Sequence, residues 1–199
     1  MDAEKLKKVT EQYIDQYKSV IMSTLKGLRA NTNLYIPHAQ FLFAIIDYYG
    51  MLFMVAKNGI FDKRKKDNFV KFFESDYFPP RLRCKASFLY FIRNGIIHQI
   101  FPKACGINST ACEDLFYEDA KHKIPVLNLF ILQDITLVAI QNFVSDINQN
   151  DTFVENIHRI LILDCNNYGL GDHKELEEEI NKNFNGKMIN LYKACGSFV

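Results

Sequence analysis

Residues 88–103 read FLYFIRNGIIHQIFPK, an apolar segment that contains an Arg, an Asn and a His within six residues. The apolar residues around this polar group predict a buried helix over about residues 81–100, which Pro102 ends because proline cannot continue a helix. Polar side chains in such a segment need partners, since burying an unpaired polar group is costly. The segment is therefore the first candidate for a functional element.

Apolar residues spaced three and four apart predict further helices on both sides of this segment. The expected helices cover residues 2–28, 37–57, 66–74 and 125–148, with Pro125 as the first residue of the last one and a loop over residues 101–123. Capping boxes at Thr152 and Asp172 favour two more helices, whereas the short apolar runs near them suit strands equally well.

Length and composition fit one domain with a small extension. The chain has 199 residues, 48% of them hydrophobic, and its nine Gly and five Pro leave few turns for a many-stranded sheet. We therefore predict an all-α protein in which residues 1–150 form an antiparallel helical bundle. Residues 151–199 are predicted to form a C-terminal extension, α or α+β, that packs on this bundle.

Charge is distributed unevenly along the chain. Residues 57–103 carry eleven basic and four acidic side chains, a net charge of +7, although the net charge of the whole chain is +1. Such a local excess can attract a phosphate backbone, so this segment is predicted to bind RNA. The alternative is that the run DKRKKD is a solvated loop whose charge the acidic C-terminal part balances. The candidate RNA-binding residues are Lys63, Arg64, Lys65, Lys66, Arg81, Arg83 and Lys103.

Nothing in the sequence predicts secretion or membrane insertion. The first residues contain no apolar run typical of a signal peptide, and the most apolar stretch, 41–56, is shorter than 18 residues and contains Asp47. We interpret this stretch as a buried core helix. The five cysteines form no dense disulfide framework, and pairing them would leave one unpaired, which is typical of reduced thiols. A cytoplasmic protein without membrane contact is expected.

Two cysteines and two histidines are of residue types that bind zinc: Cys105, Cys112, His98 and His122. The six residues between the two cysteines are not a standard zinc-binding spacing, and unliganded thiols are far commoner. We therefore expect no metal and no cofactor.

Arg93, Asn94 and His98 form a motif in which the Arg and the His are separated by four residues. Composition alone predicts about 0.45 such Arg–His pairs when three similar spacings are allowed, and about 0.04 when an Asn must follow the Arg. The motif resembles the Arg-x(4 to 6)-His signature of the HEPN superfamily, in which a polar residue commonly follows the Arg. The helix order over about residues 1–150 resembles that of HEPN domains as well.

This resemblance implies a ribonuclease that works as a homodimer, with the two copies of the motif facing each other across the two-fold axis. It also implies a role in toxin, antiviral or stress systems, where an antitoxin or another protein can be a partner.

The chemistry of the three residues gives an independent reason for the same expectation. RNA can be cut without a metal when a base removes the 2′-hydroxyl proton and a cation stabilises the phosphorane. His98 suits proton transfer near neutral pH, and Arg93 is permanently charged with donors that match phosphate oxygens. In a regular helix these two residues lie about 140° apart around the axis, whereas Asn94 and His98 share a face. Asn94 is therefore predicted to hold the imidazole while Arg93 reaches around the helix.

Asp47 and Gly95 are the other polar or small residues that need an explanation. Asp47 lies in the most apolar predicted helix, so it needs a partner, which could be Arg93, His98, a Tyr hydroxyl or a backbone group. Gly95 could loosen its helix locally or allow the close approach of a helix from a second copy.

Together these observations predict a metal-independent endoribonuclease that leaves 2′,3′-cyclic phosphate ends. His98 is the expected base, Arg93 the expected phosphorane-stabilising cation, Asn94 the orienting group and Asp47 a supporting residue. The main alternative is a non-catalytic HEPN-like dimer that binds RNA, a nucleotide or a protein. A third reading is a helical scaffold with no nucleic-acid role, in which the basic segment is only surface and Arg93 and His98 are interface or capping residues near a helix C-terminus.

Overall fold

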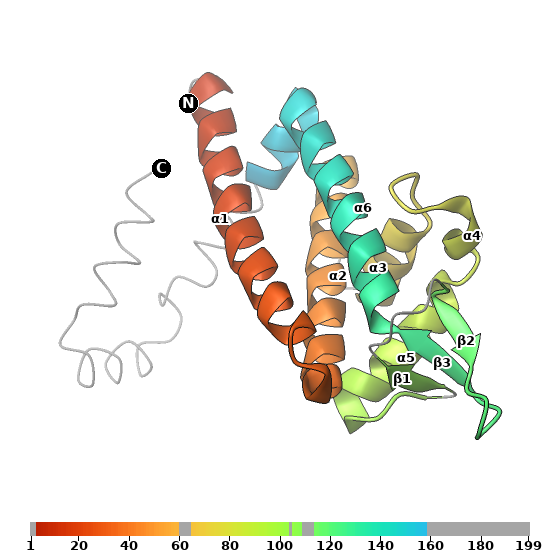
Figure 1. The fold of residues 1–199 in the computed structure, drawn as a ribbon. Helices are drawn as coiled ribbons and strands as arrows, with labels where there is room; N and C mark the ends of the chain where they lie inside the picture. The colour runs from red at the N-terminus through yellow and green to blue at the C-terminus, as the bar shows by residue number, and fades with distance from the viewer. Residues whose placement is uncertain (1–2, 60–64, 104, 109–113, 159–199) are drawn as a thin grey trace, which may run out of the picture.

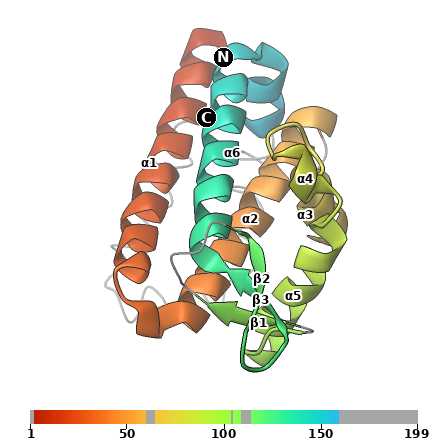
Figure 2. The ribbon, with the colours of Figure 1, turned by 45° about the vertical axis from the view of Figure 1, so that its right-hand side comes forward.

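The structure is a computed structural model that describes residues 3–59, 65–103, 105–108 and 114–158. Its longest helices are α1 (Ala3–Arg29), α2 (Tyr35–Asn58) and α6 (Leu129–Gln149), and α1 runs antiparallel to α2 (Figure 1). A short 3-10 helix, η1 (Thr32–Leu34), joins α1 to α2. Three shorter helices lie on the other side of α2 from α1 (Figure 2): α3 (Lys65–Phe73), α4 (Pro80–Arg83) and α5 (Ala86–Gln99).

Helix α2 is the centre of the structure. It contacts α1, α3, α5, α6 and strand β1, and thirteen of its 24 residues are buried. The segment 32–58 and helix α6 are long and apolar enough to cross a membrane by composition, but 67% of the apolar window of 32–58 is buried inside the protein. This degree of burial is typical of a core helix, and it confirms the buried helix predicted over residues 41–56.

Aromatic side chains from three helices form the middle of the core. Phe72 of α3 is fully buried, and its ring centroid lies 5.6 Å from that of Phe53 on α2 and 5.9 Å from that of Phe143 on α6. Phe69 and Phe73, which flank it on α3, are fully buried as well. The aromatic residues of α3 therefore hold α2 and α6 together.

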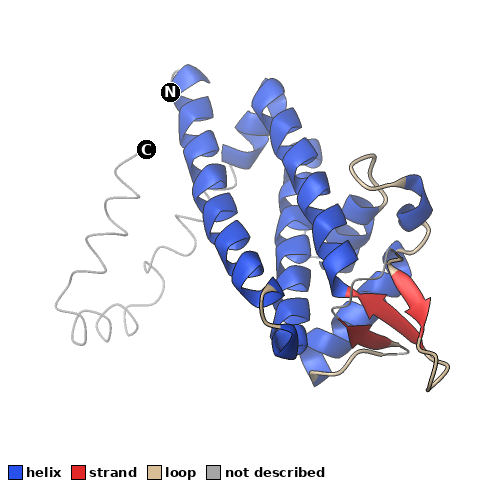
Figure 3. Cartoon of the chain, in the orientation of Figure 1, coloured by secondary structure: helices blue, strands red, loops and turns tan. Residues whose placement is uncertain are grey.

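A small mixed sheet corrects the all-α prediction. Strands β1 (Gly106–Asn108), β2 (Phe116–Glu118) and β3 (Pro125–Asn128) lie in the order β1-β3-β2, with β1 parallel and β2 antiparallel to β3 (Figure 3). Two of these strands fall in the predicted loop over residues 101–123, and Pro125 begins a strand instead of a helix, a position that proline tolerates. The protein is mostly helical with a three-stranded sheet.

The position of Asn128 explains why helix α6 begins later than predicted. The side chain of Asn128 accepts a hydrogen bond of 3.1 Å from the Phe130 N–H and so caps the first turn of α6. The helix predicted from Pro125 therefore begins at Leu129.

The helices predicted over residues 2–28, 37–57 and 66–74 are confirmed to within a few residues. The single helix predicted over 81–100 is instead two helices, a one-turn α4 that begins at Pro80 and the longer α5. Residues 151–158 are helical, and Asn150 caps them in place of Thr152, because its side chain accepts a hydrogen bond of 3.2 Å from the Phe153 N–H. The elements predicted around Asp172 and the rest of the C-terminal extension lie outside the described residues.

Helix α5 ends in a sharp reversal of the chain. Ile100 follows the helix with a φ of 68°, in the left-handed region, and the chain then turns back along α5. A Cβ atom on Gly95 would lie 2.5 Å from the Phe101 carbonyl oxygen and 2.7 Å from the Lys103 nitrogen. Gly95 is therefore required by the return of its own chain, which the sequence interpretation did not consider.

Replacing Gly95 with Ala tests this packing. The substitution would normally stabilise a helix by about 1 kcal/mol, but here the added Cβ would force the returning backbone away and cost about 1 to 3 kcal/mol. Gly27→Ala on α1 is the matched control, because its added Cβ would have nothing within 4 Å and a gain of about 1 kcal/mol is expected. Urea unfolding measures both. A stabilised Gly95→Ala protein would show that the reversal does not contact the helix.

Candidate functional site

Arg93 is buried in α5 and forms an ion pair with Asp47 on α2. The guanidinium Nε donates a hydrogen bond of 2.9 Å to Asp47 Oδ2, and Nη2 donates to the same oxygen. Only 5% of Arg93 is exposed, and 21% of the Asp47 side chain is. The sequence allowed several partners for Asp47, and the structure shows that Arg93 is one of them. The pair connects the motif helix to the central helix.

The same guanidinium reaches the other two residues of the motif. Arg93 Nη1 donates a hydrogen bond of 2.9 Å to Asn94 Oδ1 and lies 3.4 Å from His98 Nε2. An arginine side chain has only donors, so Nε2 is the acceptor and the neutral imidazole carries its proton on Nδ1. The long side chain of Arg93 spans the angle that separates it from His98 around the helix. The sequence predicted that the Arg93 side chain reaches around the helix in this way.

The hydrogen bond that fixes His98 has a different donor from the one predicted. Within the described part of the chain, Asn94 uses its carbonyl oxygen for Arg93, and the contact to the imidazole comes from Arg93. Side-chain spacing on an ideal helix favours an Asn94–His98 contact. Both Asn94 Oδ1 and His98 Nε2 instead accept from the guanidinium of Arg93, because hydrogen bonds from a charged donor are stronger than one between two neutral side chains.

Exposure increases from the cation to the imidazole. Arg93 is buried, Asn94 is half-buried and His98 is exposed. The face of the guanidinium is partly covered by Tyr90, whose ring centroid lies 5.6 Å from the Arg93 Cζ atom. A ligand arriving from solvent therefore meets the imidazole and the amide first and has the cation behind them.

The described residues of the predicted RNA-binding set have different surroundings. Lys103 packs against α5, with its Nζ atom 5.5 Å from the ring centroid of Phe91. Arg83 is held by Asp76 at 2.8 Å and by the Phe78 carbonyl oxygen at 3.0 Å. The remaining predicted residues are Lys66 and Arg81, which are exposed, Lys65, which begins α3, and Lys63 and Arg64, which lie outside the described residues.

The residues considered for zinc are in different surroundings. Cys105 is half-buried, and burial raises the pKa of its thiol to about 11. His122 contacts Asp119 through its Nδ1 atom at 2.8 Å, and the hydrogen bond from the His122 N–H, together with this contact, lowers the pKa of the Asp119 carboxyl. Cys112 lies outside the described residues. Among the described residues, no three His, Cys, Asp or Glu side chains are grouped closely enough to hold a metal ion.

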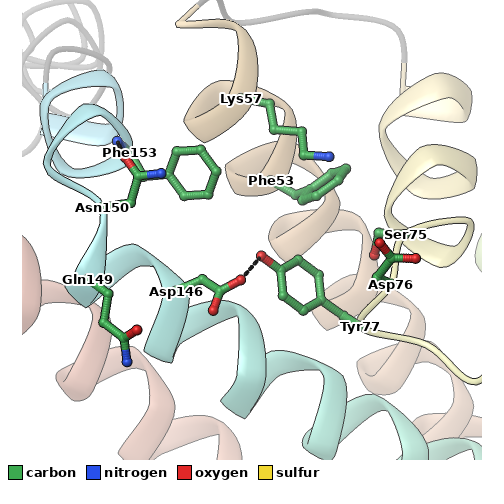
Figure 4. A pocket seen from close by; sticks show the side chains of 9 residues that line it. All are labelled: Phe53, Lys57, Ser75, Asp76, Tyr77, Asp146, Gln149, Asn150 and Phe153. Carbon is green, nitrogen blue, oxygen red and sulfur yellow. Dashed lines mark hydrogen bonds between the residues drawn. The ribbon is translucent and has the colours of Figure 1, made fainter.

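A hollow of about 450 Å³ lies between α2, the turn at 75–77 and the end of α6 (Figure 4). Two of its polar groups already have partners within the chain. The Tyr77 hydroxyl donates a hydrogen bond of 2.7 Å to Asp146, and the Lys57 ammonium lies 4.7 Å from the ring centroid of Phe53. Lys57 is ten residues beyond Asp47 on α2, about 15 Å along the helix axis, so this hollow is separate from the motif.

The ion pair between Asp47 and Arg93 can be tested by removing one or both partners. Asp47→Ala leaves a buried, uncompensated guanidinium, and we expect it to lower the free energy of unfolding by about 2 to 3 kcal/mol. The double variant Asp47→Leu with Arg93→Met should recover most of this loss, because it removes both charges. Urea unfolding measures the whole cycle. A loss below about 0.5 kcal/mol in Asp47→Ala would contradict a buried pair.

Comparison with known proteins adds no second source of information about this site. No protein-family model, no curated protein and no solved structure matches the chain. The motif and its geometry are therefore the basis on which a function is assigned.

Proposed function

We propose that this chain is a metal-independent endoribonuclease of the HEPN type, which cleaves RNA by attack of a 2′-hydroxyl on the adjacent phosphate. The observation that carries the proposal is the position of an exposed imidazole next to a buried guanidinium, with 3.4 Å between His98 Nε2 and Arg93 Nη1. A base and a cation this close together match two neighbouring atoms of RNA, the 2′-oxygen and an oxygen of the phosphate that it attacks.

The reaction needs one proton acceptor and one stabilised negative charge. The 2′-hydroxyl enters at His98 Nε2 and replaces Arg93 there, and its proton passes to that nitrogen. The 2′-oxygen forms a bond to phosphorus, and the bond from phosphorus to the 5′-oxygen breaks. The 5′-oxygen takes a proton from a water molecule, and the hydroxide that this leaves takes the proton held at His98 Nε2, which returns the neutral base. Arg93 Nη1, released from the imidazole, donates to the phosphorane oxygens that carry the developing charge. The products are a 2′,3′-cyclic phosphate and a 5′-hydroxyl.

The neighbouring residues support these two roles. Asp47 holds Arg93 through Nε and Nη2, and Asn94 accepts one hydrogen of Nη1, which leaves the other Nη1 hydrogen, directed at His98, for the reacting groups. Asn94 accepts from Arg93 through Oδ1, so its Nδ2 hydrogens can donate to the phosphate. In this proposal Arg93 both positions the imidazole at rest and stabilises charge during the reaction.

The wider context of the proposal comes from the HEPN resemblance. It comprises a cytoplasmic homodimer, a toxin, antiviral or stress system, and an antitoxin or another protein as a partner. The RNA partner follows from the proposed chemistry and from the positive charge of residues 57–103.

One observation favours a second candidate, a non-catalytic HEPN-like dimer that binds RNA, a nucleotide or a protein. The charge of Arg93 is compensated by Asp47, and its contact with His98 occupies the lone pair that a base needs. If this contact persists in the presence of RNA, the motif holds the helix together and does not act as a catalyst.

RNA cleavage in the presence of EDTA separates the two candidates. We expect purified protein to cut single-stranded RNA and leave cyclic phosphate ends, and His98→Ala to lower the rate at least about 100-fold, because a positioned base contributes that much. His122→Ala is the matched control, since its side chain is 62% exposed and lies outside the motif.

Two results would count against catalysis by this motif: a requirement for a divalent metal, or full activity of the His98→Ala variant. Salt-sensitive RNA binding without cleavage, unchanged in His98→Ala, would support the binding module.

A further inference from the structure

The hollow of about 450 Å³ between α2, the turn at 75–77 and the end of α6 is lined by three aromatic rings and two carboxylates. The rings belong to Phe53, Tyr77 and Phe153, and the carboxylates to Asp76 and Asp146. Figure 4 shows Phe153 and Phe53 on two sides of the opening, with Asp146 and Tyr77 along its lower edge. The volume is in the range of small-molecule sites, so the lining decides which class of ligand fits.

A cation already lies against one of these rings. The Lys57 ammonium is 4.7 Å from the ring centroid of Phe53, which is a cation–π distance. Lys57 is exposed, and within the described ranges its ammonium forms an ion pair with no carboxylate. Such an exposed contact is weak, and the flexible lysine stem can turn the ammonium into water. The ring face therefore accepts an ammonium, and the ammonium that it holds can be replaced.

The backbone around the hollow favours positive charge. Helices α2 and α6 end at the hollow, and α3 ends two residues before the turn at 75–77. The C-terminal end of a helix carries about half a negative charge. One helix begins here as well, over residues 151–158, and the side chain of Asn150 already caps its first turn. Three helix ends thus add to the negative charge of Asp76 and Asp146.

The two carboxylates differ in how far their charge is compensated. Asp76 is paired with Arg83 at 2.8 Å, whereas Asp146 accepts a hydrogen bond of 2.7 Å from the neutral Tyr77 hydroxyl. Burial, this hydrogen bond and the charges of Asp146 and Asp76 raise the pKa of Tyr77, so its hydroxyl stays a neutral donor. In the part of the chain that the structure describes, no cation pairs with Asp146. Asp146 is therefore the anion that a ligand can use.

We propose that this hollow binds a small alkylammonium cation, which pairs with Asp146 and replaces the Lys57 ammonium against the aromatic rings. Aromatic rings together with a carboxylate are a general means of binding organic cations. A phosphate or another anion would instead meet Asp146 and three helix C-termini, with Lys57 alone to attract it. The hollow lies about 15 Å along α2 from Asp47, so the site is separate from the motif and does not depend on RNA cleavage.

Binding of cadaverine, a linear diamine, tests the proposal. The Kd is measured by an NMR titration that follows the side-chain amides of Gln149 and Asn150, which line the hollow. The diol of the same chain length carries no charge and should not bind. We expect Asp146→Asn to raise the Kd about threefold, the effect of losing one exposed charge pair, while Asn still accepts from Tyr77. Asp114→Asn is the matched control, because Asp114 is exposed and lies outside the hollow.

Removal of the resident cation should have the opposite effect. Lys57→Ala uncovers the ring of Phe53 and removes a like charge, so the Kd for cadaverine should fall about threefold. Lys57→Arg keeps a cation at the ring and should keep the wild-type Kd. A higher or unchanged Kd in Lys57→Ala would overturn the proposal. Binding of inorganic phosphate that is lost in Lys57→Ala would show an anion site and would overturn it as well.

Two further results complete the test. Equal losses in Asp146→Asn and Asp114→Asn would show general attraction of the amine to the protein, and no binding by Lys57→Ala would show that the hollow holds no amine. Either result would overturn the proposal. N-acetyl-lysinamide then separates two sources of the same ammonium. Tighter binding than that of cadaverine would support a lysine side chain of a partner protein as the ligand, and weaker binding would support a free amine.

Discussion

The buried ion pair between Asp47 and Arg93 is the interaction on which the rest of the site depends. Moving a guanidinium and a carboxylate out of water is costly, and their attraction compensates for this only when other hydrogen bonds satisfy the remaining donors. Asn94 Oδ1 and His98 Nε2 accept from Nη1 of Arg93. The hydrogen bonds that offset the cost of burying the guanidinium therefore also fix the imidazole of His98.

The pair links the core of the protein to its surface. Asp47 belongs to α2, the helix that contacts most other elements, and His98 lies in the last turn of α5. Because α2 is held by α1, α3 and α6, the carboxylate that positions Arg93 is on a rigid element. Arg93 in turn restrains the orientation of the exposed His98 imidazole. The reversal at Ile100 then brings the Phe101 carbonyl oxygen and the Lys103 nitrogen against Gly95, three residues before His98.

Sequence reasoning was most successful where contacts are local. The spacing of apolar residues predicted α1, α2 and α3, and the spacing within residues 93–98 identified the motif. It was wrong at Pro125, which suits the first turn of a helix as well as the first position of a strand. The choice between these depends on pairing of β3 with β1 and β2, contacts that no periodicity within 125–128 reveals.

The candidate site was predictable in composition but not in geometry. Arg93, Asn94, His98 and Asp47 were all named, because a polar residue in an apolar helix is conspicuous. The donor to the imidazole was not predicted correctly, since ideal helix spacing does not account for competition among acceptors around one cation. The chain reversal after α5 was missed as well, because a left-handed Ile100 cannot be inferred from a sequence in which Gly is the usual residue for that conformation.

Arg93, held by Asp47, fixes the imidazole of His98 within one chain. The most direct measurement is the tautomer of His98, observed in ¹⁵N-resolved NMR spectra of the histidine side chains at a pH where the ring is neutral. We expect a proton on Nδ1, because Nε2 accepts from Arg93. A proton on Nε2 would show that Arg93 does not donate to the imidazole and that the ion pair does not fix the ring.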